Sequence, residues 1–290
     1  MKRSIPLWIA ALLVSLATSA AASDLGPDGV AGERHPGKFV WFDLATEDPA
    51  AARAFYAAVF GWRFHPADGA PAGYEIIEGR AGKIGGMFKR VRPQGASVGA
   101  RWISLISVAD AARAADFVKR NGGEVIVPPA TIAGRGTHAV FRDTQGAVFG
   151  VIAASGGDPA DDPVLDGEIF WVDLFARAPE TSAQFYAGLA GYEATQATTE
   201  SGRTRWLLAT GEVARAGIVP MPPGKNGPGW MPYVLVSDVA ETLRRAVAAG
   251  GKVVVAPRAD LLDRNIAVIA DPLGGTIGIV NWVTRVEPLR

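Results

Sequence analysis

The sequence predicts an α+β protein made of four βαβββ modules, two in each half of the chain. Two repeats support this prediction. The stretch FVWFDLATEDPAAARAFYAAVFGW, which begins at Phe39, returns at Ile169 as IFWVDLFARAPETSAQFYAGLAGY. A second stretch, VADAARAADFVKRNGGEVIVPP, begins at Val108 and returns at Val236 as VSDVAETLRRAVAAGGKVVVAP. The two blocks recur at nearly the same offset, which indicates a duplicated unit.

Residues 1–22 read as an export signal. Lys2 and Arg3 precede an apolar stretch from Ile5 to Ala17, and three alanines at 20–22 follow. The apolar stretch is shorter than the ~20 residues of a membrane-spanning helix. We therefore expect cleavage after Ala22, an exported product (periplasmic or secreted), and no membrane association after cleavage.

Helix starts are marked by acids. Asp48 and Asp110 each follow a β-rich stretch and precede an alanine-rich one, and aspartate is a preferred helix N-cap. Pro49 suits the first helical position. The aromatic and aliphatic residues at helical spacing after Asp48 predict a buried face, and they are Phe55, Tyr56, Val59 and Phe60.

Three β-forming stretches follow each helix, so that a module reads strand, helix, three strands. In the first half they are 61–66, 73–79 and 85–91, then 123–129, 137–143 and 147–153. The segment 155–164, rich in glycine, proline and acids, predicts a linker. It separates a first domain, 36–154, from a second, 165–284.

The composition excludes several function classes. The chain has 290 residues, a formal net charge of +0 and no cysteine. It therefore offers no disulfide, no thiolate nucleophile and no zinc–cysteine site. It also lacks the basic field that recruits nucleic acid.

These modules resemble the vicinal oxygen chelate superfamily, which includes glyoxalases, bleomycin-resistance proteins and extradiol dioxygenases. The resemblance is carried by DPAAARAFYAAVFGW (48–62), DAARAADFVKRNGGEV (110–125), DTQGAVFGV (143–151) and their partners in the second half, APETSAQFYAGLAGY (178–192), DVAETLRRAVAAGGKV (238–253) and DPLGGTIGIV (271–280). It implies two half-open eight-stranded cups with helices on the outer face.

In such families a divalent metal takes ligands from the first strand of each module and a glutamate from each last strand. The resemblance places these ligand positions at seven residues before the helix-opening acid and seven after the turn aspartate. Here they are Trp41, Ile103 and Gly150, then Trp171, Met231 and Gly278, with the remaining positions near Met87 and Ile218. Such side chains do not bind divalent ions, so we expect no metal and no other cofactor.

Trp41 and Trp171 then stand on the floors of the cups, either as plain packing or as aromatic platforms for a planar or apolar ligand. Asp43 and Asp173, two residues further along each strand, should face the same way. Each is a candidate anchor for a cationic or hydroxylated ligand. The alternative is an internal ion pair, with an arginine such as Arg101 or Arg203, or bonds to backbone amides.

Four further residues complete the candidate set. His138, on a predicted strand of the second module, is a candidate cup residue, whereas His35 and His65 read as surface residues, the latter in a turn. Met231 and Ile103 occupy first-strand positions of the later modules. Trp230 borders a proline- and glycine-rich loop at 219–232 that is a candidate rim of the second cup.

Three functions fit these observations. The first is a metal-free protein that binds a small organic molecule in its cups. The second is a metal-dependent lyase or dioxygenase with a shifted site, formed by Asp43 and His138. The third is an interaction protein whose cups are packed shut. The catalytic residues, the ligand, the pathway and the oligomeric state have no signature in the sequence.

Overall fold

The computed structural model describes residues 25–282 except 68, 71, 92–98, 199–201, 203, 223 and 225–226. The expected export signal and Arg203 therefore lie outside the described residues. Within them, no helix combines the length and the apolar character that crossing a bilayer requires.

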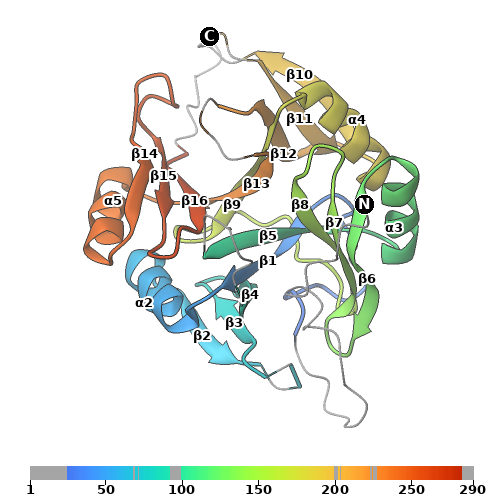
Figure 1. Ribbon diagram of the computed structural model, residues 1–290, viewed down its shortest axis with the longest axis horizontal. Helices are drawn as coiled ribbons and strands as arrows, with labels where there is room; N and C mark the ends of the chain where they lie inside the picture. Colours follow the sequence, from blue (N-terminus) through green and yellow to red (C-terminus); the bar gives the residue numbers. More distant parts are fainter. Residues whose placement is uncertain are drawn as a thin grey trace.

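Each half of the chain contains two modules of strand, helix and three strands (Figure 1). The first half consists of β1 (Phe39–Thr46), α2 (Pro49–Phe60), β2 (Arg63–Pro66), β3 (Glu75–Glu78), β4 (Lys83–Lys89), β5 (Ala100–Ser107), α3 (Ala111–Arg120), β6 (Glu124–Ile132), β7 (Gly136–Arg142) and β8 (Val148–Ala154). The second half consists of β9 (Ile169–Ala176), α4 (Pro179–Ala190), β10 (Glu193–Thr198), β11 (Thr204–Thr210), β12 (Val213–Pro220), β13 (Gly229–Leu235), α5 (Val239–Ala248), β14 (Lys252–Val255), β15 (Ile266–Ala270) and β16 (Thr276–Val280). The predicted module order is confirmed. His65 lies in strand β2 and not in the expected turn.

Each half forms one mixed, eight-stranded sheet. The strand order is β2-β3-β4-β1-β5-β8-β7-β6 in the first half and β10-β11-β12-β9-β13-β16-β15-β14 in the second. The first strands of the two modules, β1 and β5, pair antiparallel, whereas each pairs parallel with the last strand of its own module. Neither sheet closes on itself, which confirms two half-open cups.

Three of the four helices in the described part of the chain begin at an aspartate, as local chemistry predicts. Asp48 accepts the amide of Ala51 at 3.1 Å, Asp110 accepts that of Ala112 at 2.7 Å, and Asp238 accepts that of Glu241 at 2.9 Å. The fourth helix, α4, has no such side-chain cap. The Gln145 side chain of the first half binds its cap residue instead, accepting from the Ala178 amide at 2.8 Å.

A bulge in the first strand of each half directs two consecutive residues into the cup. The register shifts between Phe39 and Trp41 in β1, so that Val40 and Trp41 both belong to the cluster inside the first cup. In β9 the same shift brings Phe170 and Trp171 together on the cup side. A bulged strand loses the strict alternation of its faces at that point.

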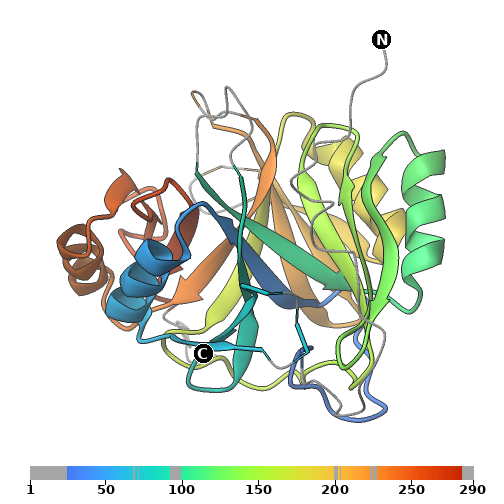
Figure 2. The ribbon, with the colours of Figure 1, turned by 60° about the horizontal axis from the view of Figure 1, so that its bottom comes forward.

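The outer faces of the two sheets share one hydrophobic core, which contains residues of both halves. Helix α2 lies beside α5, and α3 beside α4, so that each helix pair combines one helix from each half (Figures 1 and 2). At the centre, the rings of Phe39 and Trp230 lie 4.8 Å apart.

Equivalent residues tie the halves together in both directions. Tyr56 donates to Asp271 at 3.1 Å, and Tyr186 donates to Asp143 at 3.1 Å. Both aspartates lie in the turns before the last strands, where each also accepts backbone amides of its own turn. Such reciprocal contacts are expected where two copies of one unit face each other across an approximate twofold axis.

Candidate functional site

The floor of the first cup carries a buried ion pair. Arg135, in the turn between β6 and β7, donates from Nη2 to Oδ2 of Asp43 at 2.7 Å. The exposed fractions of the two side chains are 2% and 9%. Tyr74 and Trp41 donate to the other carboxylate oxygen, Oδ1, at 2.7 and 2.8 Å. The Arg135 guanidinium also lies 5.2 Å from the Trp41 ring centre.

The charges of Asp43 and Arg135 compensate each other within this network. Burial acts to lower the pKa of Arg135, but Asp43 and Tyr74 raise it above its usual value. Burial raises the pKa of Tyr74, and Asp43 adds to that effect. The Asp43 carboxylate thus receives one cationic and two neutral donors, which compensates the cost of burying its charge.

His138 lies in the same cup, on β7, and is buried. Burial lowers its pKa to about 4, and the positive charge of Arg135 contributes to the shift. Its Nδ1 has no hydrogen-bond partner among the described residues. The structure therefore brings Asp43 and His138 into one cup, but the carboxylate is already bonded to Arg135, Tyr74 and Trp41. A shifted metal site on this pair is not supported.

The second cup contains the same combination of tryptophan, aspartate and arginine, and its tryptophan and arginine are more exposed. Arg205 of β11 donates to Oδ1 of Asp173 at 2.7 Å, and Trp171 donates to the same atom at 2.8 Å. The exposed fractions of the Arg205 and Asp173 side chains are 26% and 12%. Trp171 is half-buried, whereas Trp41 is fully buried.

The polar groups of this second cup form a compact cluster. The Arg205 guanidinium lies 5.7 Å from the Trp171 ring centre. Burial raises the pKa of Asp173, while Arg205, Trp171 and Tyr233 act to lower it. The Nε of Arg205 has no partner among the described residues. The Trp171 ring and the Arg205 guanidinium are thus half-buried, whereas the Asp173 carboxylate that they contact is buried.

Glycines occupy the cup-facing positions on the last strand of every module. A side chain at Gly86 would collide with Tyr74, and one at Gly217 would collide with Arg205. In the later modules, Gly150 lies against Leu105 and Gly278 against Tyr233. Neighbouring side chains thus occupy the space where the superfamily resemblance expects metal-binding glutamates.

Met87 and Ile218 lie in the core on the helix side. In the sequence they are the residues nearest to two of these ligand positions. Strand pairing sets Gly86 opposite Asp43 and Gly217 opposite Asp173. The cup-facing residues at these two positions are therefore Gly86 and Gly217, each adjacent to the residue named from the sequence.

The cup positions do not fit a divalent metal. Ile103 lies opposite Asp43 and Met231 opposite Asp173 on the neighbouring strand, and neither offers a donor suited to such an ion. Among the described residues, no three histidine, aspartate or glutamate side chains are grouped as a metal site requires.

Two other sequence-based expectations need correction. Trp230 does not border the second cup, because it lies next to cup-facing Met231 and therefore points to the opposite face. There it is buried and donates to the Tyr186 hydroxyl at 2.9 Å. The internal ion pairs exist, but their arginines are Arg135 and Arg205. Arg101 is exposed.

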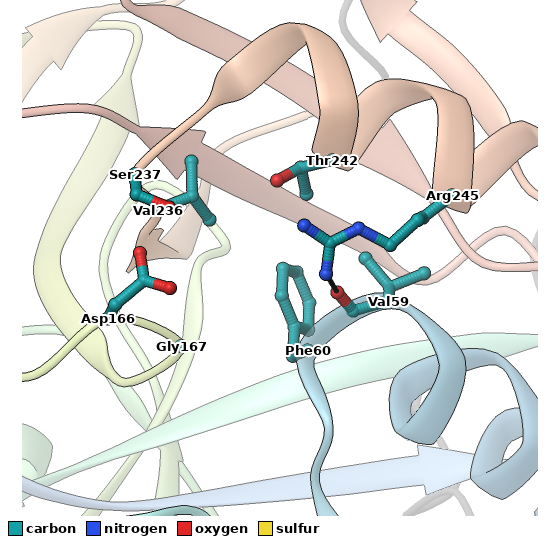
Figure 3. Close-up of a pocket in the computed structure, with 8 residues that line it drawn as sticks. All are labelled: Val59, Phe60, Asp166, Gly167, Val236, Ser237, Thr242 and Arg245. Carbon is teal, nitrogen blue, oxygen red and sulfur yellow. Dashed lines mark hydrogen bonds between the residues drawn. The ribbon is translucent and has the colours of Figure 1, made fainter.

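A separate crevice lies between the halves, where α2 and α5 approach the turn before β9 (Figure 3). Its volume is about 30 Å³, against about 300–1,000 Å³ for a typical ligand pocket. Arg245 reaches across it to the Val59 carbonyl at 3.2 Å. This crevice has room for water but not for an organic substrate.

Comparison with known proteins agrees with this architecture. Residues 38–78 match the family model described as bleomycin resistance protein-like N-terminal, and residues 170–280 match the glyoxalase-like domain. The chain is 32% identical over 250 residues to the anthracycline biosynthesis protein DnrV of Streptomyces peucetius, covering 79% of this chain and 90% of that one. It is 28% identical over 246 residues to "Putative glyoxylase CFP32" of Mycobacterium tuberculosis, covering 83% and 93%.

Solved structures share the fold at low sequence identity. A Mn(II)-bound glyoxalase from Novosphingobium aromaticivorans aligns with a TM-score of 0.59 at 15% identity, covering 85% of this chain and 82% of that one. An extradiol ring-cleaving dioxygenase from B. fuscum aligns with a TM-score of 0.59 at 14% identity, covering 90% and 76%. The chain belongs to the vicinal oxygen chelate superfamily, as a tandem glyoxalase- and bleomycin-resistance-like member.

Proposed function

We propose that this protein is exported and binds a small planar organic molecule in its second cup, without a divalent metal. The observation that carries the proposal is the cluster of Trp171, Asp173 and Arg205, of which the indole and the guanidinium are half-buried. A half-buried indole offers a stacking surface, while the paired charges offer both a donor and an acceptor. Glycine and apolar residues occupy the positions that would otherwise hold metal ligands.

The ligand class follows from the shape and chemistry of this cluster. An aromatic platform favours flat, largely apolar molecules, and a carboxylate–guanidinium pair favours hydroxyl or keto groups on their edge. DnrV is named for anthracycline biosynthesis, and anthracyclines combine a flat ring system with such groups. Doxorubicin is therefore a suitable fluorescent probe.

The test is a fluorescence titration of the purified protein with doxorubicin. We expect one site per chain, and Trp171→Ala should weaken binding by about 1–3 kcal/mol, or roughly 5- to 150-fold, through lost stacking area. Trp41→Phe is the matched control, because it alters the equivalent position of the first cup, and its Kd should equal that of the wild type. Absence of binding, or weakening by Trp41→Phe alone, would contradict the proposal.

Export rests on the basic start and the alanine triplet at 20–22. Expression in a bacterial host should release a product that begins at Ser23. N-terminal sequencing of that product checks the cleavage site, and a product beginning at Met1 would be evidence against export.

A further inference from the structure

We propose that residues 25–30, here called the strap, form a plug that closes the first cup and leaves only the second accessible. Leu25 is 2% exposed and packs in the cluster that fills this cup, together with Trp41 and Tyr74. Gly26 and Pro27 are also buried. Leu25 thus belongs to the core of the first cup, although it precedes the first strand of that cup, which begins at Phe39.

The strap is fixed to both modules of the first half. At one end, Gly26 lies so close to the backbone of Gly134 and Arg135 that an added Cβ would be 3.2–3.3 Å from it. Further along, Asp28 accepts the Lys83 amide at 2.7 Å and pairs with the Lys83 ammonium at 2.8 Å. Residues 134–135 join β6 and β7, whereas Lys83 opens β4, so these contacts lie on opposite sides of β1 and β5 in the sheet.

A third attachment holds the end of the strap. The amide of Val30 donates to the Asp158 carbonyl at 3.0 Å. The Asp158 carboxylate accepts the His35 amide at 2.7 Å and the Ser107 hydroxyl at 2.6 Å. Asp158 is fully buried, so the linker between the halves helps to hold the strap in place.

The duplicated half provides an internal comparison. The segment 155–160 precedes β9 at the same distance along the chain as the strap precedes β1, yet it contacts the first half instead of plugging the second cup. Lys38 binds the carbonyls of Pro159 and Ala160 at 2.8 and 2.6 Å. Beyond them, Val164 and Leu165 are exposed. The segment equivalent to the strap therefore does not plug the second cup, which agrees with the greater exposure of Arg205 and Trp171.

The strap explains why the two cups differ although they share a sequence pattern. Leu25 keeps water away from the Asp43–Arg135 pair, and a molecule entering this cup would first have to displace it. Cleavage after Ala22 would make Leu25 the third residue of the mature chain, so the strap would be retained. The closure of the first cup is independent of whether the second cup binds a ligand.

The absence of native cysteine allows a direct test with a single introduced thiol. Val40→Cys places a thiol in the first cup beside the strap, and Phe170→Cys, at the equivalent position of the repeat, places one in the second cup. The rate of reaction with 5,5′-dithiobis(2-nitrobenzoic acid) measures access to each. Leu25→Ser should speed the reaction at Val40→Cys at least tenfold and leave that at Phe170→Cys unchanged.

Two further variants test whether the effect of Leu25→Ser could arise from misfolding. Asp28→Ala removes the Lys83 attachment without touching the cup interior and should speed the Val40→Cys reaction in the same way. Val30→Ser, at an exposed position of the strap, should have no effect. The proposal would be overturned if neither Leu25→Ser nor Asp28→Ala changed the rate at Val40→Cys. Equal increases at the two thiols would also overturn it.

Discussion

Removing the arginine of the first cup should destabilise the protein more than removing that of the second. In Arg135→Met an apolar chain of similar length replaces the guanidinium, and the Asp43 carboxylate keeps only two neutral donors. Breaking one partner of a buried pair costs about 3–5 kcal/mol, because the remaining charge stays buried. This is a large share of the roughly 5–15 kcal/mol by which a domain is stable.

Arg205→Met is the matched control in the second cup. The Arg205 and Asp173 side chains are 26% and 12% exposed, against 2% and 9% for Arg135 and Asp43. Water partly screens the pair and solvates the carboxylate that remains, so the loss should be about 1–2 kcal/mol. The two losses differ by about 1–4 kcal/mol, which corresponds to at least a fivefold difference in the unfolding equilibrium constant.

Urea unfolding followed by far-ultraviolet circular dichroism at pH 7.5 measures both losses, provided that the m-values stay equal. The double variant Asp43→Leu with Arg135→Met should recover at least half of the loss, because it leaves no charge unpaired. Equal losses for the two single variants, or no recovery in the double variant, would refute the assignment of a closed first cup.

Two further stability predictions follow from the buried polar groups. The pKa of His138 is about 4 in the folded protein against about 6.5 unfolded, so its contribution to stability is complete above pH 6.5 and is lost as pH falls toward 4. Between pH 7.5 and 4.5 the wild type should lose about 2–3 kcal/mol more than His138→Met in urea unfolding, and parallel pH profiles would contradict this. Tyr56→Phe and Tyr186→Phe should each cost about 1–3 kcal/mol, since the indole N–H of Trp102 or Trp230 loses its acceptor. Thermal unfolding checks both, and unchanged melting temperatures would argue against a structural role for these bonds.

The fold could be predicted because local signals and the repeat agree. Asp48 and Asp110 mark helix starts by their own chemistry, and the constant offset of the repeat pairs Trp41 with Trp171 and Asp43 with Asp173 without any structural information. Both tryptophans indeed donate to the aspartate two residues on. Such short-range geometry follows directly from strand alternation.

The partners of these aspartates could not be predicted from the repeat. Arg135 comes from the second module of its half, whereas Arg205 comes from the first module of the other half, so the two arginines are not repeat equivalents. Each reaches its carboxylate only after distant strands have paired. The repeat implies equivalent sites. In the structure, however, the two buried aspartates pair with arginines from non-equivalent positions.

Long-range packing also determines where the side chains of Trp230 and Leu25 lie. Sequence reasoning assigns Trp230 to a loop rim, but the outer faces of the two sheets meet, and the indole is buried between them. Leu25 lies before the first predicted strand and carries no periodic signal. Its role becomes visible only when the first cup is seen to contain it.

The most direct test of metal-free ligand binding in the second cup is native mass spectrometry of the purified chain, with elemental analysis of the same sample. We expect no stoichiometric manganese, iron, nickel or zinc. With doxorubicin added, a single adduct should appear that is lost in Trp171→Ala and kept in Trp41→Phe. A stoichiometric divalent ion whose removal by a chelator abolishes that adduct, and whose return restores it, would contradict the account.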